Sequence, residues 1–266
     1  MGDIADKAWP VTPQPAAGSR ARFAAALAWI GVIVAAGSGL LELLAGFGHR
    51  LGWWHFGVGI QIVRWSALAA LVALAVALIA LLASIGTGAR AARWAAVLAL
   101  VLGAASAGPP LYLYEQAMRL PPIHDISTDT VNPPRFTAVL PLRGRSANST
   151  EYSATVAAEQ KRAYPDIGPA TFDVPPQQEL QTAERVARAM GWQIVAVESD
   201  PLRIEATATT LLFGFKDDVV VRITPQGGGS RVDVRSLSRV GVSDLGTNAE
   251  RIRTFLAKLR AASAQS

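Results

Sequence analysis

The stretch DDVVVRITPQGGGSRVDVRSLSR, Asp217 to Arg239, alternates apolar and polar residues on both sides of a glycine-rich centre. A two-residue period indicates β-strands, and the short connection between the two halves indicates an antiparallel hairpin. A hairpin centred on Gly227-Gly228 places Arg222 opposite Asp233, so that the apolar residues of both strands share one face. We expect the charged residues on the other face to form a solvated surface whose charges neutralise one another.

Two more runs with a two-residue period precede this hairpin, at Trp192–Glu198 and Leu202–Thr209. Apolar residues at helical spacing follow Pro175-Pro176, and a second amphipathic helix is expected to begin at Thr247. For residues 119–266 the sequence therefore predicts an α+β domain with a four-stranded antiparallel meander flanked by two helices.

Three uncharged runs lie upstream of this domain, Phe23–Leu41, Trp65–Ile85 and Trp94–Tyr114, with 19, 21 and 21 residues. A helix needs roughly 20 residues to cross the hydrocarbon core of a bilayer. The sequence therefore predicts a disordered N-terminal tail at residues 1–22 and a transmembrane region of three α-helices at residues 23–118. The apolar fraction of the whole chain, 51%, agrees with a lipid bilayer as one of its partners.

The basic residues that flank the spans predict the orientation of the chain, because Lys and Arg are more frequent on the cytoplasmic side. Five of them lie on the side of the N-terminus and three on the other side. They are Lys7, Arg20, Arg22, Arg90 and Arg93 against Arg50, Arg64 and Arg119. We expect a multi-pass protein of the bacterial inner (plasma) membrane, with a cytoplasmic N-terminus and a periplasmic C-terminal domain.

Two charges fall near the ends of the first two spans, at Glu42 and Arg64. With a helical rise of about 1.5 Å per residue, both lie roughly 10 Å below the same membrane surface. An isolated charge at that depth is costly, so we predict that they form an intramembrane ion pair that clamps the two helices together. A proton or ion site is the alternative.

The charge balance of the exposed domain argues against a nucleic-acid partner. Residues 119–266 carry 18 Lys and Arg against 16 Asp and Glu, and their basic residues form no cluster interleaved with aromatics. The chain has no cysteine, which excludes disulfides and thiolate metal sites.

The turn between the last predicted strand and the last helix can be interpreted in two ways. Arg239, several hydroxyl groups and the unpaired first N–H groups of the helix could bind a carboxylate or phosphate. Alternatively, Thr247 and Glu250 form a capping box, and Arg239 pairs with Asp244. The candidate ligand-binding residues are His124, Asp125, Asp129, Arg235, Ser238, Arg239, Ser243 and Asn248.

Two motifs, PPIHDISTDTVNPPRF (Pro121–Phe136) and RSLSRVGVSDLGTNAERIRTF (Arg235–Phe255), resemble the bacterial family known as domain of unknown function 1499. The shorter motifs YPDIGP, GWQIV and FGFKDDVVVRI follow in the expected order between them. The resemblance covers roughly residues 119–262 and brings no agreed activity with it. It implies that the two long motifs belong to one unit, with His124, Asp125 and Asp129 packed against the turn before the last helix.

We therefore expect a membrane-anchored accessory protein of the cell envelope whose exported domain binds a protein partner or a small anionic ligand. We expect no catalytic residue, metal or cofactor. The alternative is an envelope hydrolase or metal-dependent enzyme centred on His124, the only histidine of the domain. In a hydrolase, Asp125 or Asp129 would orient His124 as the general base. The serine nucleophile would be Ser236, Ser238 or Ser243, and a metal site would add Asp217 or Asp218.

Overall fold

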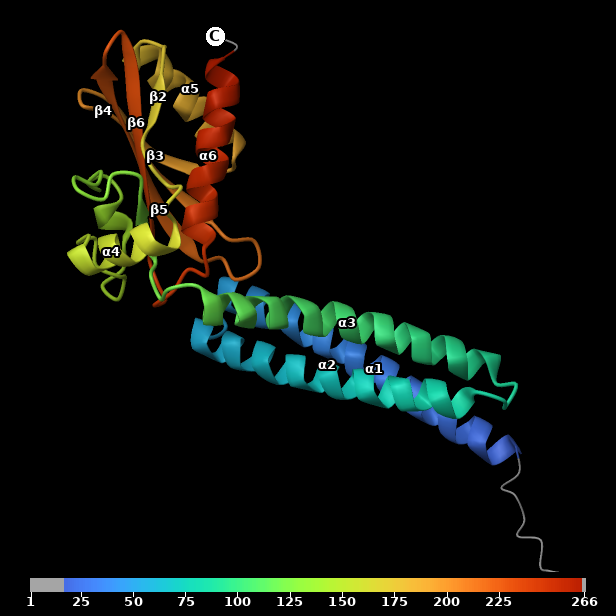
Figure 1. Cartoon of the computed structure of the whole chain (residues 1–266). Coiled ribbons are helices and arrows are strands. Elements are labelled where there is room, and N and C mark those ends of the chain that lie inside the picture. Colours follow the sequence, from blue (N-terminus) through green and yellow to red (C-terminus); the bar gives the residue numbers. More distant parts are fainter. Residues whose placement is uncertain (1–16, 265–266) are drawn as a thin grey trace, which may run out of the picture. The chain divides into compact units, whose positions relative to one another are not determined.

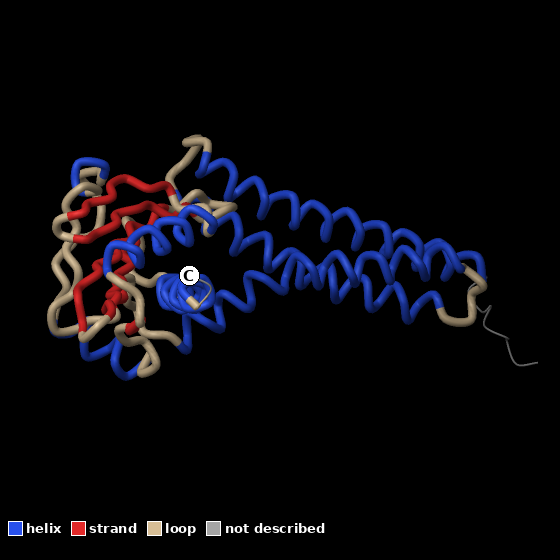
Figure 2. The backbone as a smooth tube through the Cα atoms, turned by 90° about the horizontal axis from the view of Figure 1, so that it is seen from above, coloured by secondary structure: helices blue, strands red, loops and turns tan. Residues whose placement is uncertain are grey.

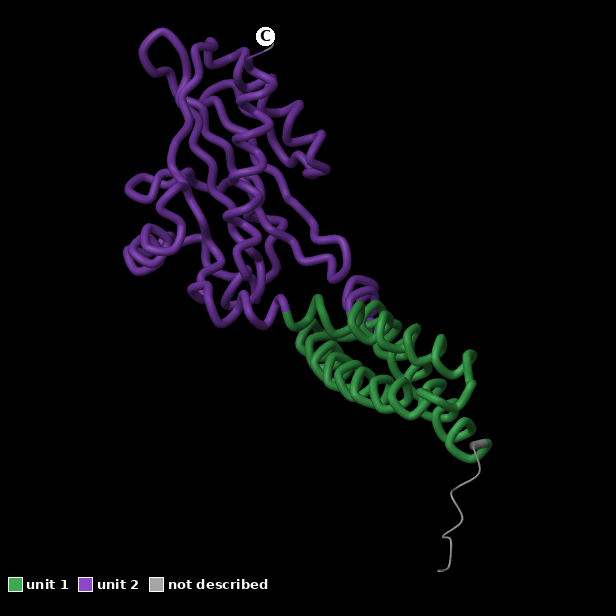
Figure 3. The backbone as a smooth tube through the Cα atoms, turned by 45° about the vertical axis from the view of Figure 1, so that its right-hand side comes forward, with its two compact units in different colours: residues 1–45, 54–111 green, residues 46–53, 112–266 purple. Residues whose placement is uncertain are grey.

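The structure is a computed structural model that describes residues 17–264 (Figure 1). Figure 3 shows two compact units, whose described residues are 17–45 with 54–111 and 46–53 with 112–264. The first unit contains most of three long helices, and the second contains a β-sheet with shorter helices.

The long helices are α1 (Ala17–Arg50), α2 (Phe56–Ser84) and α3 (Arg90–Arg119). Each is long and apolar enough to cross a membrane, which confirms the three predicted membrane-capable helices. The disordered tail predicted at residues 1–22 falls largely on residues 1–16, which lie outside the described residues. Its last six residues belong to α1.

Small residues line the contacts within the helical unit. On α2 the buried positions Ser66, Ala70 and Ala73 recur at spacings of three and four residues, which keeps them on one side of the helix. A Cβ added at Gly31 of α1 would lie 3.2 Å from the Cβ of Ala99 on α3, so the backbones approach closely there. Most of the large apolar side chains point outward instead, as expected for helices surrounded by lipid.

The second unit contains one antiparallel sheet, drawn in red in Figure 2. Its strands are β1 (Asp125–Ser127), β2 (Ala170–Phe172), β3 (Gln193–Ser199), β4 (Leu202–Thr209), β5 (Lys216–Gln226) and β6 (Gly229–Ser238). The spatial order is β1-β6-β5-β4-β3, and β2 pairs with β6 beside β1. The predicted meander corresponds to β3 through β6.

The sheet has six strands, so the predicted four-stranded sheet is wrong in its extent. The strands β1 and β2 have three residues each, which is too short to display a two-residue period in the sequence. Both pair with the outer edge of β6, β1 along Arg235–Leu237 and β2 along Ser230–Val232. They therefore cover an edge that the meander alone would leave open.

The hairpin of β5 and β6 has the predicted register, with Arg222 opposite Asp233. Since successive side chains of a strand point to opposite faces, this register gathers Val219, Val221 and Val234 on one face. We call this the apolar face and the opposite one the charged face.

Two helices pack on the apolar face, α5 (Pro176–Ala189) and α6 (Thr247–Ser263), and Figure 1 shows both on the same side of the sheet. Phe255 of α6 is fully buried and stacks on the larger core residue Trp192, with ring centroids 5.0 Å apart. Both predicted helices are thus confirmed. The unit also contains α4 (Ala154–Ala163) and the short 3-10 helix η1 (Leu140–Leu142), which the sequence did not predict.

Candidate functional site

The charged face carries polar side chains at most positions of the three central strands. They are Arg203, Glu205 and Thr207 on β4, Asp218 and Arg222 on β5, and Arg231, Asp233 and Arg235 on β6. Only a small apolar cluster interrupts them, in which Val220 and Leu237 contact Phe136 and Val139.

This face is buried, so the solvated surface predicted for it is wrong. Asp218, Asp233 and Arg235 are 0%, 1% and 2% exposed. Residues 128–153, which we call the covering loop, cross the face and bond to its side chains. The strand alternation shows only that the face is polar. Its burial depends on a loop almost a hundred residues upstream, which has no periodic pattern.

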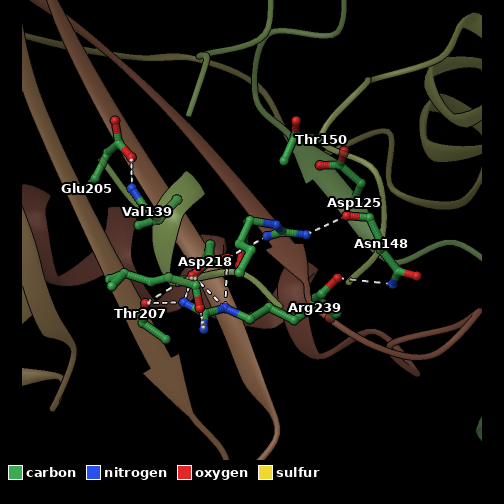
Figure 4. A network of polar contacts seen from close by, with 12 residues as sticks. Asp125, Val139, Asn148, Thr150, Glu205, Thr207, Asp218 and Arg239 are labelled. Carbon is green, nitrogen blue, oxygen red and sulfur yellow. Dashed lines mark hydrogen bonds and ion pairs between the residues drawn. The ribbon is translucent and has the colours of Figure 1, made fainter. Parts of the chain in front are cut away.

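Glu205 shows how the covering loop is attached. Its carboxylate accepts hydrogen bonds from the backbone N–H groups of Thr137 and Val139, both at 2.9 Å, and from the hydroxyl of Thr137 at 2.7 Å. A buried carboxylate needs such partners, because an unpaired charge in the interior is costly. Figure 4 shows the contact between Glu205 and Val139.

Arg235 and Asp125 form a buried ion pair. The Nε and Nη2 groups of Arg235 donate to the two carboxylate oxygens of Asp125 at 2.9 and 2.7 Å. The same guanidinium donates to the carbonyl oxygens of Pro134 and Thr150 in the covering loop. Burial raises the pKa of Asp125, and the hydrogen bonds and charge of Arg235 offset part of that rise.

Arg239 belongs to a second buried cluster, centred on Asp218 (Figure 4). Its Nε and Nη2 groups donate to the Asp218 carboxylate, with the shortest distance 2.7 Å, and Arg143 of the covering loop pairs with the same carboxylate. The hydroxyl of Thr207 donates to Asp218 at 2.9 Å. Arg239 therefore pairs with Asp218, and the pairing with Asp244 that the sequence suggested is wrong.

Asp129 lies in a third cluster with Arg222, Arg231 and Asp233. Both arginines donate to Asp129 at 3.1 Å and to Asp233 at 3.0 Å, so two acids and two bases neutralise one another. Burial raises the pKa of Asp129. The N–H groups of the next residues in the covering loop and the two guanidinium groups outweigh that effect, and the net pKa is lowered.

The turn before α6 already contains an anion, which is the carboxylate of Asp244. This carboxylate accepts from the N–H groups of Gly246 and Asn248, both at 2.9 Å, and the carbonyl of Asp244 accepts from Thr247. Gly246 occupies the N-cap position with φ 83° and makes no side-chain cap. The predicted capping box of Thr247 and Glu250 is therefore wrong, and Asp244 caps the helix from the preceding turn.

His124, Ser238, Ser243 and Asn248 lie around this turn. The Nδ1 atom of His124 is 3.1 Å from the carbonyl oxygen of Val242, and the His124 carbonyl accepts from Ser238 and Asn248. The amide of Asn248 also donates to the Ser238 hydroxyl at 2.9 Å. The hydroxyl of Ser243 accepts from the N–H of Leu245 within the turn.

The predicted site residues thus divide among several places. His124, Ser238, Ser243 and Asn248 surround the turn before α6, as the resemblance implied for His124. Asp125, Asp129, Arg235 and Arg239 belong to the buried clusters of the charged face instead. Alternation in a strand shows which residues share a face, but not which long side chains meet across it.

Glu42 and Arg64 are the two charges predicted to form an ion pair within the membrane. Glu42 of α1 is half-buried, whereas Arg64 of α2 is exposed. Arg64 precedes the packed Ser66 by two residues, which corresponds to about 200° around the helix. Among the ion pairs of residues 17–264, none joins Glu42 to Arg64, so their pairing stays a prediction. Equal depth in the membrane does not place two residues on facing sides.

A cavity of about 410 Å³ opens beside Arg235 at the edge of the covering loop. Its walls include Asn132, Arg135, Phe136 and Tyr152. The Arg235 guanidinium carbon lies 5.0 Å from the ring centre of Phe136 and 5.4 Å from that of Tyr152. Cation–π contacts on both rings fix the direction of the guanidinium.

Several residues of this site gave no signal in the sequence. Arg143 and Asn148 lie in a stretch rich in Gly, Ser and Asn, and nothing there indicates that they bind buried groups. Gln160, which joins α4 to β1 through the backbone of Ser127, is an ordinary polar residue of a short helix. Asp244 could have been found, because an acidic residue before a helix is a common cap.

Comparisons with known proteins give the family but no activity. A family model described as "Protein of unknown function (DUF1499)" matches residues 125–259. No curated protein matches the chain. The solved structure of TTHA0849 from Thermus thermophilus is 12% identical, with a TM-score of 0.25, and the match covers 37% of this chain and 95% of that one. The family match covers half of the chain and includes all six strands, and the chain belongs to the DUF1499 family.

Proposed function

We propose that this protein is a membrane-anchored accessory protein of the bacterial cell envelope, whose domain at residues 119–266 binds a small anionic ligand. The three membrane-capable helices support an anchor in the inner membrane. The excess of Lys and Arg on the side of the membrane that holds the N-terminus, five against three, supports a cytoplasmic N-terminus and a periplasmic domain.

The observation that carries the proposal is the cavity beside Arg235. A guanidinium has five N–H donors, and four of those of Arg235 have partners among the described residues, at Asp125, Pro134 and Thr150. The fifth, on Nη1, is left for a ligand. An arginine that is 2% exposed and held between two aromatic rings is a preorganised donor for a carboxylate or phosphate.

Arg135 and Asn132 supply further donors at the mouth of this cavity. Both side chains are exposed, and among residues 17–264 neither is bound to another side chain. Arg135 adds a positive charge to the walls of the cavity and Glu151 adds a negative one, while Asp125 is already paired with Arg235. The cavity volume suits a small molecule better than a protein partner.

The enzyme alternative has less support in the geometry. The hydrogen bond of the His124 ring goes to the carbonyl of Val242 instead of Asp125 or Asp129. Ser238 accepts from Asn248, and Ser236 donates to Asn248. Among residues 17–264 no group of three or more His, Asp or Glu could hold a metal ion.

A thermal-shift titration of the full chain in detergent micelles tests the proposal. Phosphate, sulfate and citrate are compared with chloride at equal ionic strength. Binding to the folded state raises the melting temperature by mass action. We expect a rise with at least one of these anions that Arg135→Ala abolishes, without lowering the melting temperature in chloride.

Arg145→Ala is the matched control, because Arg145 is an exposed arginine of the covering loop that does not line the cavity. It should respond to anions as the unaltered chain does. An equal response of Arg135→Ala and the unaltered chain would refute the site. A fall in melting temperature on adding a chelator would instead support the metal-dependent enzyme.

A further inference from the structure

A larger cavity, of about 790 Å³, lies in the second unit on the other side of the sheet from the Arg235 cavity. One wall consists of Tyr112, Leu113 and Gln116, in the last turns of α3. Another consists of the first turns of α6, and Trp192 and Tyr164 contribute aromatic surface. None of its lining residues belongs to the candidate ligand-binding set described above.

The hydroxyl of Tyr164 is buried in this wall without a hydrogen-bond partner among the described residues. The Tyr164 residue is 5% exposed, and its oxygen lies 3.6 Å from where a Cβ of Gly246 would be. Burial and the nearby Asp244 carboxylate raise the pKa of Tyr164, so the hydroxyl stays protonated. A buried donor without an acceptor destabilises the folded state, and a ligand oxygen would satisfy this one.

The N–H groups at the start of α6 are not the donors of this cavity, since Asp244 and the turn already occupy those of Gly246, Thr247 and Asn248. The positive charge comes from side chains instead. Arg253 lies over the Tyr164 ring at 5.5 Å and is 38% exposed, with its Nε and Nη2 groups on Asp166. Its Nη1 group lies 3.8 Å from a carboxylate oxygen of Glu250.

The cavity is lined by the last turns of α3, and this position indicates which ligands can reach it. The uncharged run of α3 ends at Tyr114, so Tyr112 and Leu113 lie at the end of a membrane-capable segment. Tyrosine is enriched at that level of a bilayer. A neighbouring hollow shares Leu120 with the cavity and adds Arg119 and Arg162 against one acid, Glu159. Basic groups directly after a span attract anionic lipids.

The geometry points to this cavity as a binding site for an anionic phospholipid of the surrounding bilayer. The glycerophosphate group binds between Tyr164 and Arg253, with the tyrosine hydroxyl donating to one of its oxygens. An acyl chain leaves along the apolar side of α3 formed by Tyr112 and Leu113. The lipid thereby ties the water-exposed domain to the membrane that its own helix has just left.

Native mass spectrometry of the full chain in detergent micelles tests this inference. The probes are phosphatidylglycerol and phosphatidylcholine of equal chain length. We expect one phosphatidylglycerol to bind in preference to phosphatidylcholine. Tyr164→Phe should weaken that binding by roughly three- to tenfold, the value of one hydrogen bond. The melting temperature of the lipid-free Tyr164→Phe variant should not fall, because the lost hydroxyl had no partner.

Tyr114→Phe is the matched control, since Tyr114 is an exposed tyrosine of α3 outside the cavity, and it should leave lipid binding unchanged. Equal lipid binding by Tyr164→Phe and Tyr114→Phe would overturn the proposal. So would equal affinity for the two lipids. Displacement of phosphatidylglycerol by inorganic phosphate at low millimolar concentration would show a site for free anions and would overturn the assignment to lipid.

Discussion

The two faces of the sheet are both buried, but different interactions bury them. The apolar face is closed by α5 and α6 through side chains such as Phe255 and Leu259. The charged face is closed by an irregular loop through ion pairs and hydrogen bonds to Glu205, Asp218 and Arg235. Apolar contacts tolerate small shifts in position, whereas each buried charge requires its partner at hydrogen-bond distance. The charged face therefore fixes the path of the covering loop, and with it the cavity beside Arg235.

The largest effect is expected where one acid holds two buried arginines. Asp218→Ala leaves Arg239 and Arg143 without their carboxylate, and breaking a buried pair typically costs about 3–5 kcal/mol. The free energy of unfolding can be measured by hydrogen exchange at the β5 and β6 amides of the full chain. Asp166→Ala is the control, because it breaks an Asp–Arg pair at the surface and should cost at most about 1 kcal/mol. Similar losses of stability in both variants would show that the ion pairs of Asp218 contribute no more than an ion pair at the surface.

A double substitution tests whether the ion pair of Asp125 and Arg235 adds stability or only specifies the path of the covering loop. Asp125→Leu and Arg235→Met each leave one buried charge unpaired. The double variant removes both charges and should lose less than the sum of the two single variants, by roughly 2 kcal/mol. Urea unfolding of the four chains in detergent micelles measures this coupling. Additive losses would mean that the two side chains do not act as a pair.

The start of α6 distinguishes the cap that the sequence predicted from the cap that the structure contains. Asp244→Ala should lower the free energy of unfolding by about 1–2 kcal/mol, because two N–H groups lose their acceptor. Thr247→Ala should change it by less than about 0.5 kcal/mol. Both values can be obtained from urea unfolding. A larger loss of stability in Thr247→Ala than in Asp244→Ala would contradict the cap by Asp244 and support the capping box of Thr247 and Glu250.

The smallest expected effect is a difference in pH dependence between acids on the two sides of the sheet. Burial raises the pKa of Glu179, whose carboxylate accepts a hydrogen bond from the hydroxyl of Ser263 on the helical side of the sheet. Folded Glu179 therefore keeps its proton at pH values where the unfolded chain has lost it. Stability falls as pH rises through this range, and Glu179→Gln removes that fall.

Asp129 should show the opposite sign, since its pKa is lowered in the folded chain. Its contribution is present above the ordinary pKa of an aspartate and is lost as pH falls through the folded value. Asp129→Asn should therefore lose stability at neutral pH and little in acid. Urea unfolding of both variants at acidic and neutral pH checks the two signs. A common sign would mean that the covering loop does not stabilise the charged form of Asp129.

The sequence predicted the structure correctly where a repeating pattern of apolar and polar residues reflects the surroundings of the segment that carries it. Runs such as Trp65–Ile85 predicted the membrane-capable helices, and the alternation on either side of Gly227-Gly228 predicted the register that joins Arg222 to Asp233. Gly191, the residue after the C-cap of α5, has a positive φ, which is a common conformation just past the end of a helix. Each of these features depends on neighbours along the chain or across one hairpin.

The candidate site could be predicted only in part, because its contacts join distant segments. The motifs around His124 and Asn248 do meet at the turn before α6. The partners of Arg235 and Arg239 could not be inferred, since an arginine side chain can reach several acids on the same face. Arg235 pairs with Asp125 in β1, whereas Arg239 pairs with Asp218 in β5.

The sequence by itself determined which segments prefer lipid, which strands pair in the hairpin and which residues share a face, because local periodicity encodes those properties. Only the tertiary structure decided that the charged face is buried and that the carboxylate of Asp244 binds the first N–H groups of α6. These outcomes depend on how a non-periodic loop or a helix face meets a distant partner. Free energies of that kind arise from pairwise contacts in three dimensions, which no spacing along the chain records.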